Sequence, residues 1–151
     1  MPPWILLQGH CIMHLLHSSN FLVMSSWRKV LAVVLVSVFC FFNLCFPDHY
    51  DVKMPCHLIL SKLADKCPSA ILAVLDSLVD PLQKTINFKP KQDAVKQEVD
   101  RNEDMIRSAL RAIASLNRIS GGDCSIKFKN LMNEIAKSPT LWDKYHFIRN
   151  E

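Results

Sequence analysis

The stretch DAVKQEVDRNEDMIRSALRAIASLNR, residues 93–118, decides the fold class of this chain. Its apolar residues recur at helical spacing and share one face of an α-helix: Val95, Val99, Ile106, Leu110, Ile113 and Leu116. Ala109 and Ala112 lie beside this stripe and permit close packing of a neighbouring helix. Glu103 and Arg107 form a favourable i, i+4 pair on the polar side. We predict that one long amphipathic helix spans this stretch.

Two shorter helical patterns precede it. The first carries the apolar residues Val52, Cys56, Ile59, Leu63 and Cys67, and the second carries Ile71, Val74, Leu75, Leu78 and Leu82. Asp80–Pro81 is expected to end or kink the second helix, because proline lacks the amide hydrogen that a helix interior uses. A basic loop, Lys84–Gln92, is predicted to follow.

Two further patterns come after the long helix. Gly121–Gly122 is expected to end that helix in the left-handed conformation that glycine adopts readily. Asp123 or Ser125 can cap a fourth helix, and Ser138–Pro139 can open a fifth. We expect these residues to point inward: Ile126, Leu131, Met132 and Ile135 from the fourth helix, and Leu141, Trp142, Tyr145 and Ile148 from the fifth.

No stretch of the sequence alternates polar and apolar residues over the length of a strand between hairpin turns. The chain is therefore predicted to be all-α, with about five helices that are each apolar on one side. Such helices with short loops suit either an antiparallel bundle or an α-solenoid. Periodicity alone leaves that choice open.

Charge divides the chain near Pro47. All fourteen acidic residues lie at or after Asp48, whereas the first 47 residues hold only two cations, Arg28 and Lys29. We predict an apolar leader over residues 1–47, either helical or disordered, and a helical domain over residues 48–151.

Residues 30–46, VLAVVLVSVFCFFNLCF, leave three interpretations open. This uncharged run is close to the lower limit of ~17 residues for a transmembrane helix. A signal peptide is a second interpretation, although no small-residue cleavage site follows the run. The third is translated non-coding sequence, because pyrimidine-rich codons encode Phe, Leu, Ser, Cys and Pro.

The residues give no reason to expect an enzyme, a cofactor or a metal site. No phosphate-binding loop, dinucleotide fingerprint or HExxH motif occurs, and Ser108, like the other serines, lacks an assignable histidine partner. His10, His14 and His17 have a spacing that can bind zinc, but no acidic residue is near enough in sequence to orient their rings. Interleaved acids and bases argue against a nucleic-acid partner.

The six cysteines contain no CxxC motif, so no disulfide or metal framework is predicted. Cys56 and Cys67 fall on apolar helix faces and are expected to be buried free thiols. Reduced thiols suit a reducing compartment.

Four lysines gather in and just after the predicted loop: Lys84, Lys89, Lys91 and Lys96. We interpret them either as a surface that recognises an acidic protein partner or as a solvated connector. They are the candidate protein-binding residues. Trp142 and Tyr145 are either interface anchors or a cap on the final hydrophobic layer.

Two long runs carry a resemblance to a known family. They are DHYDVKMPCHLILSKLADKCPSAILAVLDSLVDPLQKT, residues 48–85, and KPKQDAVKQEVDRNEDMIRSALRAIASL, residues 89–116. Together with the closing IRNE, residues 148–151, they resemble the C-terminal end of the cullin-associated, neddylation-dissociated family, most closely its plant members. The resemblance covers residues 48–151 and none of the leader.

The resemblance implies a HEAT-repeat α-solenoid whose final portion is a TATA-binding-protein-interacting domain. It also implies a non-enzymatic role in the ubiquitin conjugation pathway. Members of the family wrap around an unneddylated cullin of an SCF-type ubiquitin ligase, displace the adaptor with its substrate receptor, and so promote receptor exchange and complex assembly. The implied location is the cytoplasm and nucleus, and no catalytic residue, cofactor, nucleic acid or small-molecule substrate follows from the resemblance.

Residues 48–151 correspond to about two and a half repeats of a much longer solenoid, and each repeat contacts only its neighbours. We therefore expect weak or no independent exchange activity. The alternative function is a single-pass membrane protein, anchored through residues 30–46, that carries a helical protein-interaction domain and resides in a membrane.

Overall fold

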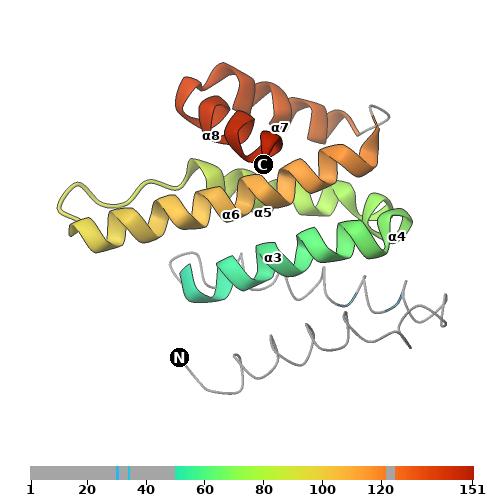
Figure 1. Cartoon of the computed structure of the whole chain (residues 1–151), viewed down its shortest axis with the longest axis horizontal. Helices are drawn as coiled ribbons and strands as arrows, with labels where there is room; N and C mark the ends of the chain where they lie inside the picture. The colour runs from blue at the N-terminus through green and yellow to red at the C-terminus, as the bar shows by residue number, and fades with distance from the viewer. Residues whose placement is uncertain (1–29, 31–33, 35–49, 122–124) are drawn as a thin grey trace.

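The computed structural model describes residues 30, 34, 50–121 and 125–151 (Figure 1). Six helices have defined bounds within these residues: α3 (Tyr50–Lys66), α4 (Pro68–Ala73), α5 (Leu75–Asn87), α6 (Lys96–Ser120), α7 (Ile126–Lys137) and α8 (Pro139–Asn150). The described residues include no β-strand, which confirms the predicted all-α class. The predicted leader, residues 1–47, lies outside the described residues except for Val30 and Val34.

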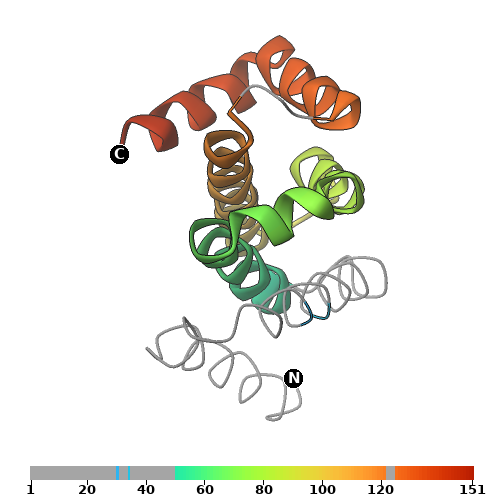
Figure 2. The same cartoon turned by 90° about the vertical axis from the view of Figure 1, so that its right-hand side faces the viewer.

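The helices stack in two rows, seen end-on in Figure 2. One row contains α3, α6 and α8, in which α3 packs on α6 and α6 packs on α8. The other contains the α4–α5 pair and α7, and α5 contacts both α6 and α7. Adjacent helices of one row come from successive repeats, as in an α-solenoid. This arrangement confirms the predicted short HEAT-type α-solenoid fragment and excludes the bundle.

The α3 and α6 helices run parallel. His57 of α3 lies beside Ser108 of α6, Ser61 beside Ser115, and Asp65 beside Arg118. The partners advance together along both helices, which requires the same chain direction in each. The chain therefore returns through α4 and α5 between the two parallel helices, as it does between successive repeats of an α-solenoid.

A single apolar core lies between the two rows. Its largest fully buried side chains are Tyr145, Phe128, Leu63, Ile71, Leu78, Leu82, Met105, Leu110, Ile113, Leu116, Leu131 and Ile135. Burying a side chain of this size contributes roughly 1.5–3 kcal/mol relative to exposure. The core therefore draws on every helix, with the largest share from α5 and α6.

The predicted helix ends are largely confirmed. Gly121 ends α6 in the left-handed region, with φ 58°. Ser125 caps α7, since its Oγ accepts a hydrogen bond from the Phe128 amide at 3.2 Å. Ser138 ends α7 and begins α8, and Pro139 follows it as the first residue of α8.

The second predicted helix is divided at Val74, which explains the sixth helix. The Val74 amide bonds to the Ile71 carbonyl at 3.1 Å, and the Ser77 amide bonds to the Val74 carbonyl at 3.1 Å. These i→i−3 bonds tighten the turn and redirect the chain. The expected stop at Asp80–Pro81 is wrong, because α5 continues through a buried Pro81 to Asn87.

The connection before α6 also differs from the prediction. It covers Phe88–Val95 instead of Lys84–Gln92, because α5 continues to Asn87 and α6 begins at Lys96. Val95 and Val99 are 66% and 36% exposed, so they are not part of the core stripe. Figure 1 shows the reason: the amino end of α6, in yellow, extends past the ends of α3, α7 and α8.

Two residues predicted to point inward are exposed. Ile126 is 78% exposed, because it lies five residues from Leu131, roughly 140° around the helix from the buried face. Trp142 is 37% exposed and lies at the edge of the stripe centred on Tyr145. The buried residue that the prediction missed in α7 is Phe128.

No helix within the described parts of the chain is both long and apolar enough to cross a membrane. The predicted transmembrane segment, residues 30–46, lies outside those parts. Its two described residues, Val30 and Val34, are 57% and 50% exposed.

Candidate protein-binding surfaces

The lysine surface, formed by Lys84, Lys89, Lys91 and Lys96, surrounds the connection between α5 and α6. Lys84 lies in the last turn of α5, and Lys96 is the first residue of α6. All four side chains are exposed, and none forms an ion pair with another described residue. Asp93 is the only acidic residue in the sequence between Lys84 and Lys96. The local charge is therefore positive and available to a partner.

The base of this connection is fixed by packing. The Phe88 ring meets the Tyr50 ring edge-on with centroids 6.5 Å apart. Asn102, which is 4% exposed, donates its Nδ2 hydrogen to the Phe88 carbonyl at 3.4 Å. A turn follows, in which the Ala94 amide bonds to the Lys91 carbonyl at 3.1 Å. Lys89 and Lys91 therefore extend from a backbone that is held at both ends.

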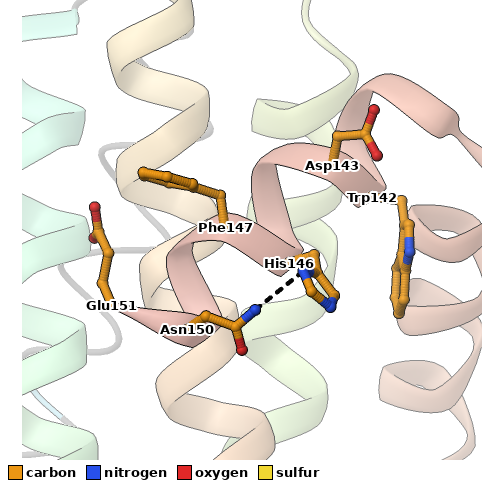
Figure 3. A pocket seen from close by; sticks show the side chains of 6 residues that line it. All are labelled: Trp142, Asp143, His146, Phe147, Asn150 and Glu151. Atoms are coloured by element: carbon orange, nitrogen blue, oxygen red, sulfur yellow. Dashed lines mark hydrogen bonds between the residues drawn. The ribbon is translucent and has the colours of Figure 1, made fainter.

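A second surface, the α8 hollow, lies on the outer side of the last helix (Figure 3). It is lined by Trp142, Asp143, His146, Phe147, Asn150 and Glu151. Phe147 is 69% exposed and Trp142 is 37% exposed. All six residues come from one helix and the residue after it, so the hollow is a shallow surface feature and not an enclosed cleft.

The side chains of the α8 hollow hold one another in place. The Trp142 ring lies 5.9 Å from the Tyr145 ring and 6.3 Å from the His146 ring, between centroids. Asn150 Nδ2 donates to His146 Nδ1 at 3.1 Å, and Figure 3 shows this bond. His146 Nδ1 is then an acceptor, which leaves its Nε2 as a hydrogen-bond donor.

The two acidic residues of the α8 hollow differ in their partners. Glu151 pairs with Arg111 of α6, at 3.3 Å between Oε2 and a guanidinium nitrogen. Asp143 has no ion pair with any described residue. One carboxylate beside Trp142 is thus open to an incoming cation.

Polar contacts between stacked helices fix the positions of both surfaces. Gln83 of α5 donates to both carboxylate oxygens of Glu134 in α7, at 2.9 and 2.8 Å. Asn117 Nδ2 of α6 donates to Tyr145 Oη of α8 at 3.2 Å. The Asp65–Arg118 pair does the same for α3 and α6. These contacts set the register of the rows around the apolar core.

Ser108 has a histidine partner that the sequence did not reveal. His57 Nδ1 lies 2.9 Å from Ser108 Oγ, although the two residues are 51 apart in sequence. Ser108 Oγ donates its own hydrogen to the Met105 carbonyl at 2.7 Å, so the imidazole does not draw a proton from it. His57 is fully buried. The pair therefore joins α3 to α6 and does not form a nucleophile.

Burial, together with the smaller effect of the nearby Lys53 charge, lowers the pKa of His57 from 6.5 to about 3. The imidazole is therefore neutral near pH 7. Lys53 is itself 3% exposed, and neither residue was part of the predicted stripe of α3. The buried face of α3 is rotated toward these two positions, so Cys56 and Ile59 are only half-buried.

Cys67 is buried and Cys56 half-buried, and neither forms a disulfide with a described residue. Burial raises the pKa of Cys56 to about 11, so its reactive thiolate is scarce near neutral pH. No group of three or more His, Cys, Asp or Glu side chains that could hold a metal occurs in residues 50–121 and 125–151. His10, His14 and His17 lie outside the described residues.

Sequence reasoning identified the lysines and Trp142 but missed His146, Phe147 and Asn150. The usable signal was spacing, because Trp142, His146 and Asn150 follow one another at i, i+4 and i+8 on one helix face. A second signal was the presence of three aromatic residues in a twelve-residue helix, because one face of such a helix cannot bury all three.

Several curated proteins are similar to this chain. "Cullin-associated NEDD8-dissociated protein 1" of Arabidopsis thaliana is 75% identical over 104 residues, which cover 69% of this chain and 8% of that protein. The protein of the same name from Dictyostelium discoideum is 37% identical over 102 residues, covering 68% and 8%. "Cullin-associated NEDD8-dissociated protein 2" of Mus musculus is 39% identical over 104 residues, covering 68% and 7%. The chain spans less than a tenth of the length of these relatives.

A family model described as TATA-binding protein interacting (TIP20) matches residues 28–137. The match includes α3 to α7 and both ends of the lysine surface. It begins within the segment predicted as a leader. Because this match covers more than half of the sequence, the chain belongs to the TATA-binding protein interacting (TIP20) family.

Proposed function

We propose that this chain is a non-enzymatic protein-binding module that contacts a cullin. The observation that carries the proposal is the 75% identity over 104 residues with a protein named "Cullin-associated NEDD8-dissociated protein 1". The two-row stack supports it, because a solenoid repeat folds against its immediate neighbours and presents the same surface in a short or a long array.

The lysine surface is the proposed contact with an acidic region of the cullin. Its four cations are exposed, carry no ion pair to a described residue, and extend from an anchored connection. Complementary charge accelerates association and selects partners more than it adds affinity. The module would thus recognise and orient the partner, while the apolar contacts of a longer array supply tight binding.

In this proposal the partner is an unneddylated cullin of an SCF-type ligase, in the cytoplasm or nucleus. The mechanism is competition: the module occupies part of the surface that an adaptor with its substrate receptor would use, which regulates assembly of the complex. Residues 48–151 form the binding unit, whose length equals the 104 residues aligned with the plant relative. Since the chain spans 8% of that relative, exchange activity of its own would be weak or absent.

The test is a titration of the full chain against the unneddylated amino-terminal half of a plant cullin, measured by biolayer interferometry. We expect saturable binding with a Kd in the micromolar range or weaker. Replacing Lys89, Lys91 and Lys96 together with Glu should slow association by about tenfold, because steering depends on charge sign. Lys84 is left in place, so that this variant and its control each change three charges.

The matched control replaces Lys66, Lys129 and Lys137 with Glu. These lysines are also exposed and make no ion pair with a described residue, and the net charge changes equally. Absence of saturable binding by the unaltered chain would refute the module hypothesis. Equal slowing by both triple variants would keep the module but remove the lysine surface as its contact.

A further inference from the structure

The α8 helix buries far less of its apolar surface than its sequence offers. Of its twelve residues only Tyr145 is buried, while Leu141 and Ile148 are half-buried against the core. The other two aromatic residues, Trp142 and Phe147, lie on the outer side. Both line the α8 hollow. Exposed aromatic side chains around one hollow are typical of surfaces that bind another protein.

The α8 hollow is organised before any partner arrives. The Trp142 ring contacts the rings of Tyr145 and His146, and His146 is held in turn by Asn150. Tyr145 is anchored in the core and bonded to Asn117. Side chains that are already fixed lose little conformational entropy on binding, which favours affinity.

The charge of the α8 hollow favours a cationic occupant. Asp143 and Glu151 are its only charged residues of fixed sign, and both are negative. Arg111 compensates Glu151, whereas Asp143 has no ion pair to a described residue. A cationic ligand would therefore be attracted to the hollow by the Asp143 carboxylate.

We propose that the α8 hollow binds a basic amphipathic segment of a partner protein. Its Arg or Lys would pair with Asp143 and lie against the face of Trp142, since a carboxylate beside an aromatic ring stabilises a cation twice. An adjacent aliphatic side chain would cover Phe147. Arginine fits best, because its planar guanidinium can stack on a ring and bond a carboxylate at the same time. This surface is separate from the lysine surface and does not depend on the proposed function.

The experiment measures fluorescence anisotropy of a labelled synthetic helical peptide titrated with the full chain. The peptide has 14 residues, with Leu at positions of one helix face and Arg at the polar positions. A matched peptide carries Glu in place of every Arg. We expect saturable binding of the Arg peptide and no measurable binding of the Glu peptide.

Substitutions in the chain test whether the Arg peptide binds at the α8 hollow. Trp142→Ala should raise the Kd of the Arg peptide at least about tenfold, as removal of a buried aromatic anchor does. Asp143→Asn, which keeps the shape and removes the charge, should raise it several-fold. Ile126→Ala is the control, because Ile126 is 78% exposed on α7 and lies outside the hollow. It should leave the Kd unchanged within about twofold.

Far-UV circular dichroism of each variant separates loss of binding from loss of folding. If Trp142→Ala does not fold, Phe147→Ala replaces it, since Phe147 is 69% exposed. Equal binding of the Glu peptide, or an unchanged Kd in the Trp142 and Phe147 variants, would overturn the proposal. Sedimentation velocity covers one alternative occupant: a dimer of the unaltered chain that dissociates on Trp142→Ala would assign the hollow to a second copy and overturn it as well.

Discussion

The α6 and α8 helices show how position in the stack changes what a similar amphipathic pattern does. α6 packs against α3, α4, α5 and α8, and it buries nine residues. α8 packs against α6 and α7, and it buries one. Both sequences are amphipathic, but α6 has neighbours on several sides while the outer face of α8 meets solvent (Figure 2). The inner helix therefore supplies stability, and the outer one retains surface for recognition.

The difference between α6 and α8 is tested most directly by removing a leucine side chain from each helix. Leu110→Ala in α6 should lower the free energy of unfolding by about 2–5 kcal/mol, because Leu110 is fully buried and the change leaves a cavity. Leu141→Ala in α8 should cost about 1 kcal/mol, since Leu141 is only half-buried. Urea unfolding followed by circular dichroism measures both. Equal losses would show that α8 is as much a part of the core as α6.

A pH titration of unfolding tests the packing of α3 against α6 around His57. The pKa of His57 is about 3 in the folded chain and near 6.5 when unfolded. Between these values the unfolded state binds the proton and the folded state does not. Stability should therefore be fully present above pH 6.5 and fall on acidification, by up to about 1.4 kcal/mol per pH unit.

The control for that titration is His57→Gln, which removes the titrating group and retains a polar side chain. Its unfolding free energy should change less between pH 6.5 and pH 4.5 than that of the unaltered chain. An unchanged slope in the variant would assign the pH dependence to other groups, and His57 would then contribute only packing.

Tyr145→Phe tests the hydrogen bond between α6 and α8. It removes the Tyr145 hydroxyl, which accepts a hydrogen bond from Asn117 at 3.2 Å, and keeps the buried ring. The expected loss is about 1 kcal/mol in the free energy of unfolding. Asn117→Ala should cost a similar amount, and the double variant should cost less than the sum of the two. Strict additivity would mean that the bond contributes nothing.

The smallest effect should come from the ion pairs on the exposed side of α6. Arg107 lies 3.9 Å from Glu103 and 3.6 Å from Asp104, with about half of each side chain exposed. Arg107→Ala should change the free energy of unfolding by less than about 0.5 kcal/mol, because solvent screens such pairs. A loss above 1 kcal/mol, measured in the same urea assay, would indicate that the polar side of α6 has a structural role.

The sequence was sufficient for α6 because its stripe from Ile106 to Leu116 is long and regular. It was insufficient wherever the outcome depended on neighbours. Val95 and Val99 continue the stripe at the amino end of α6, which extends past α3, α7 and α8, and they are 66% and 36% exposed. Pro81 suggested a helix end, yet the bend occurs at Val74, where the chain must turn to bring α5 against α6.

The candidate surfaces were likewise predictable where the signal is local in sequence, and not where it depends on neighbouring helices. The lysines were identifiable because charge clusters along the sequence around one connection. The α8 hollow was only partly identifiable, because Trp142 and Tyr145 are close in sequence and nothing local indicates which one the core will accept. The His57–Ser108 contact was out of reach, since it depends on the parallel packing of α3 and α6.

Ser138 sets the direction in which α8 leaves α7. This single residue separates α7 from α8 and has an extended backbone, with φ −94° and ψ 109°. The Pro139 ring disfavours the helical conformation for the residue before it, so the chain must turn a corner here. Covalent geometry thus works with packing to aim Trp142 outward. Pro139→Ala would lift that restriction and allow the two short helices to fuse into one straight rod, which would carry Tyr145 out of the core and away from Asn117.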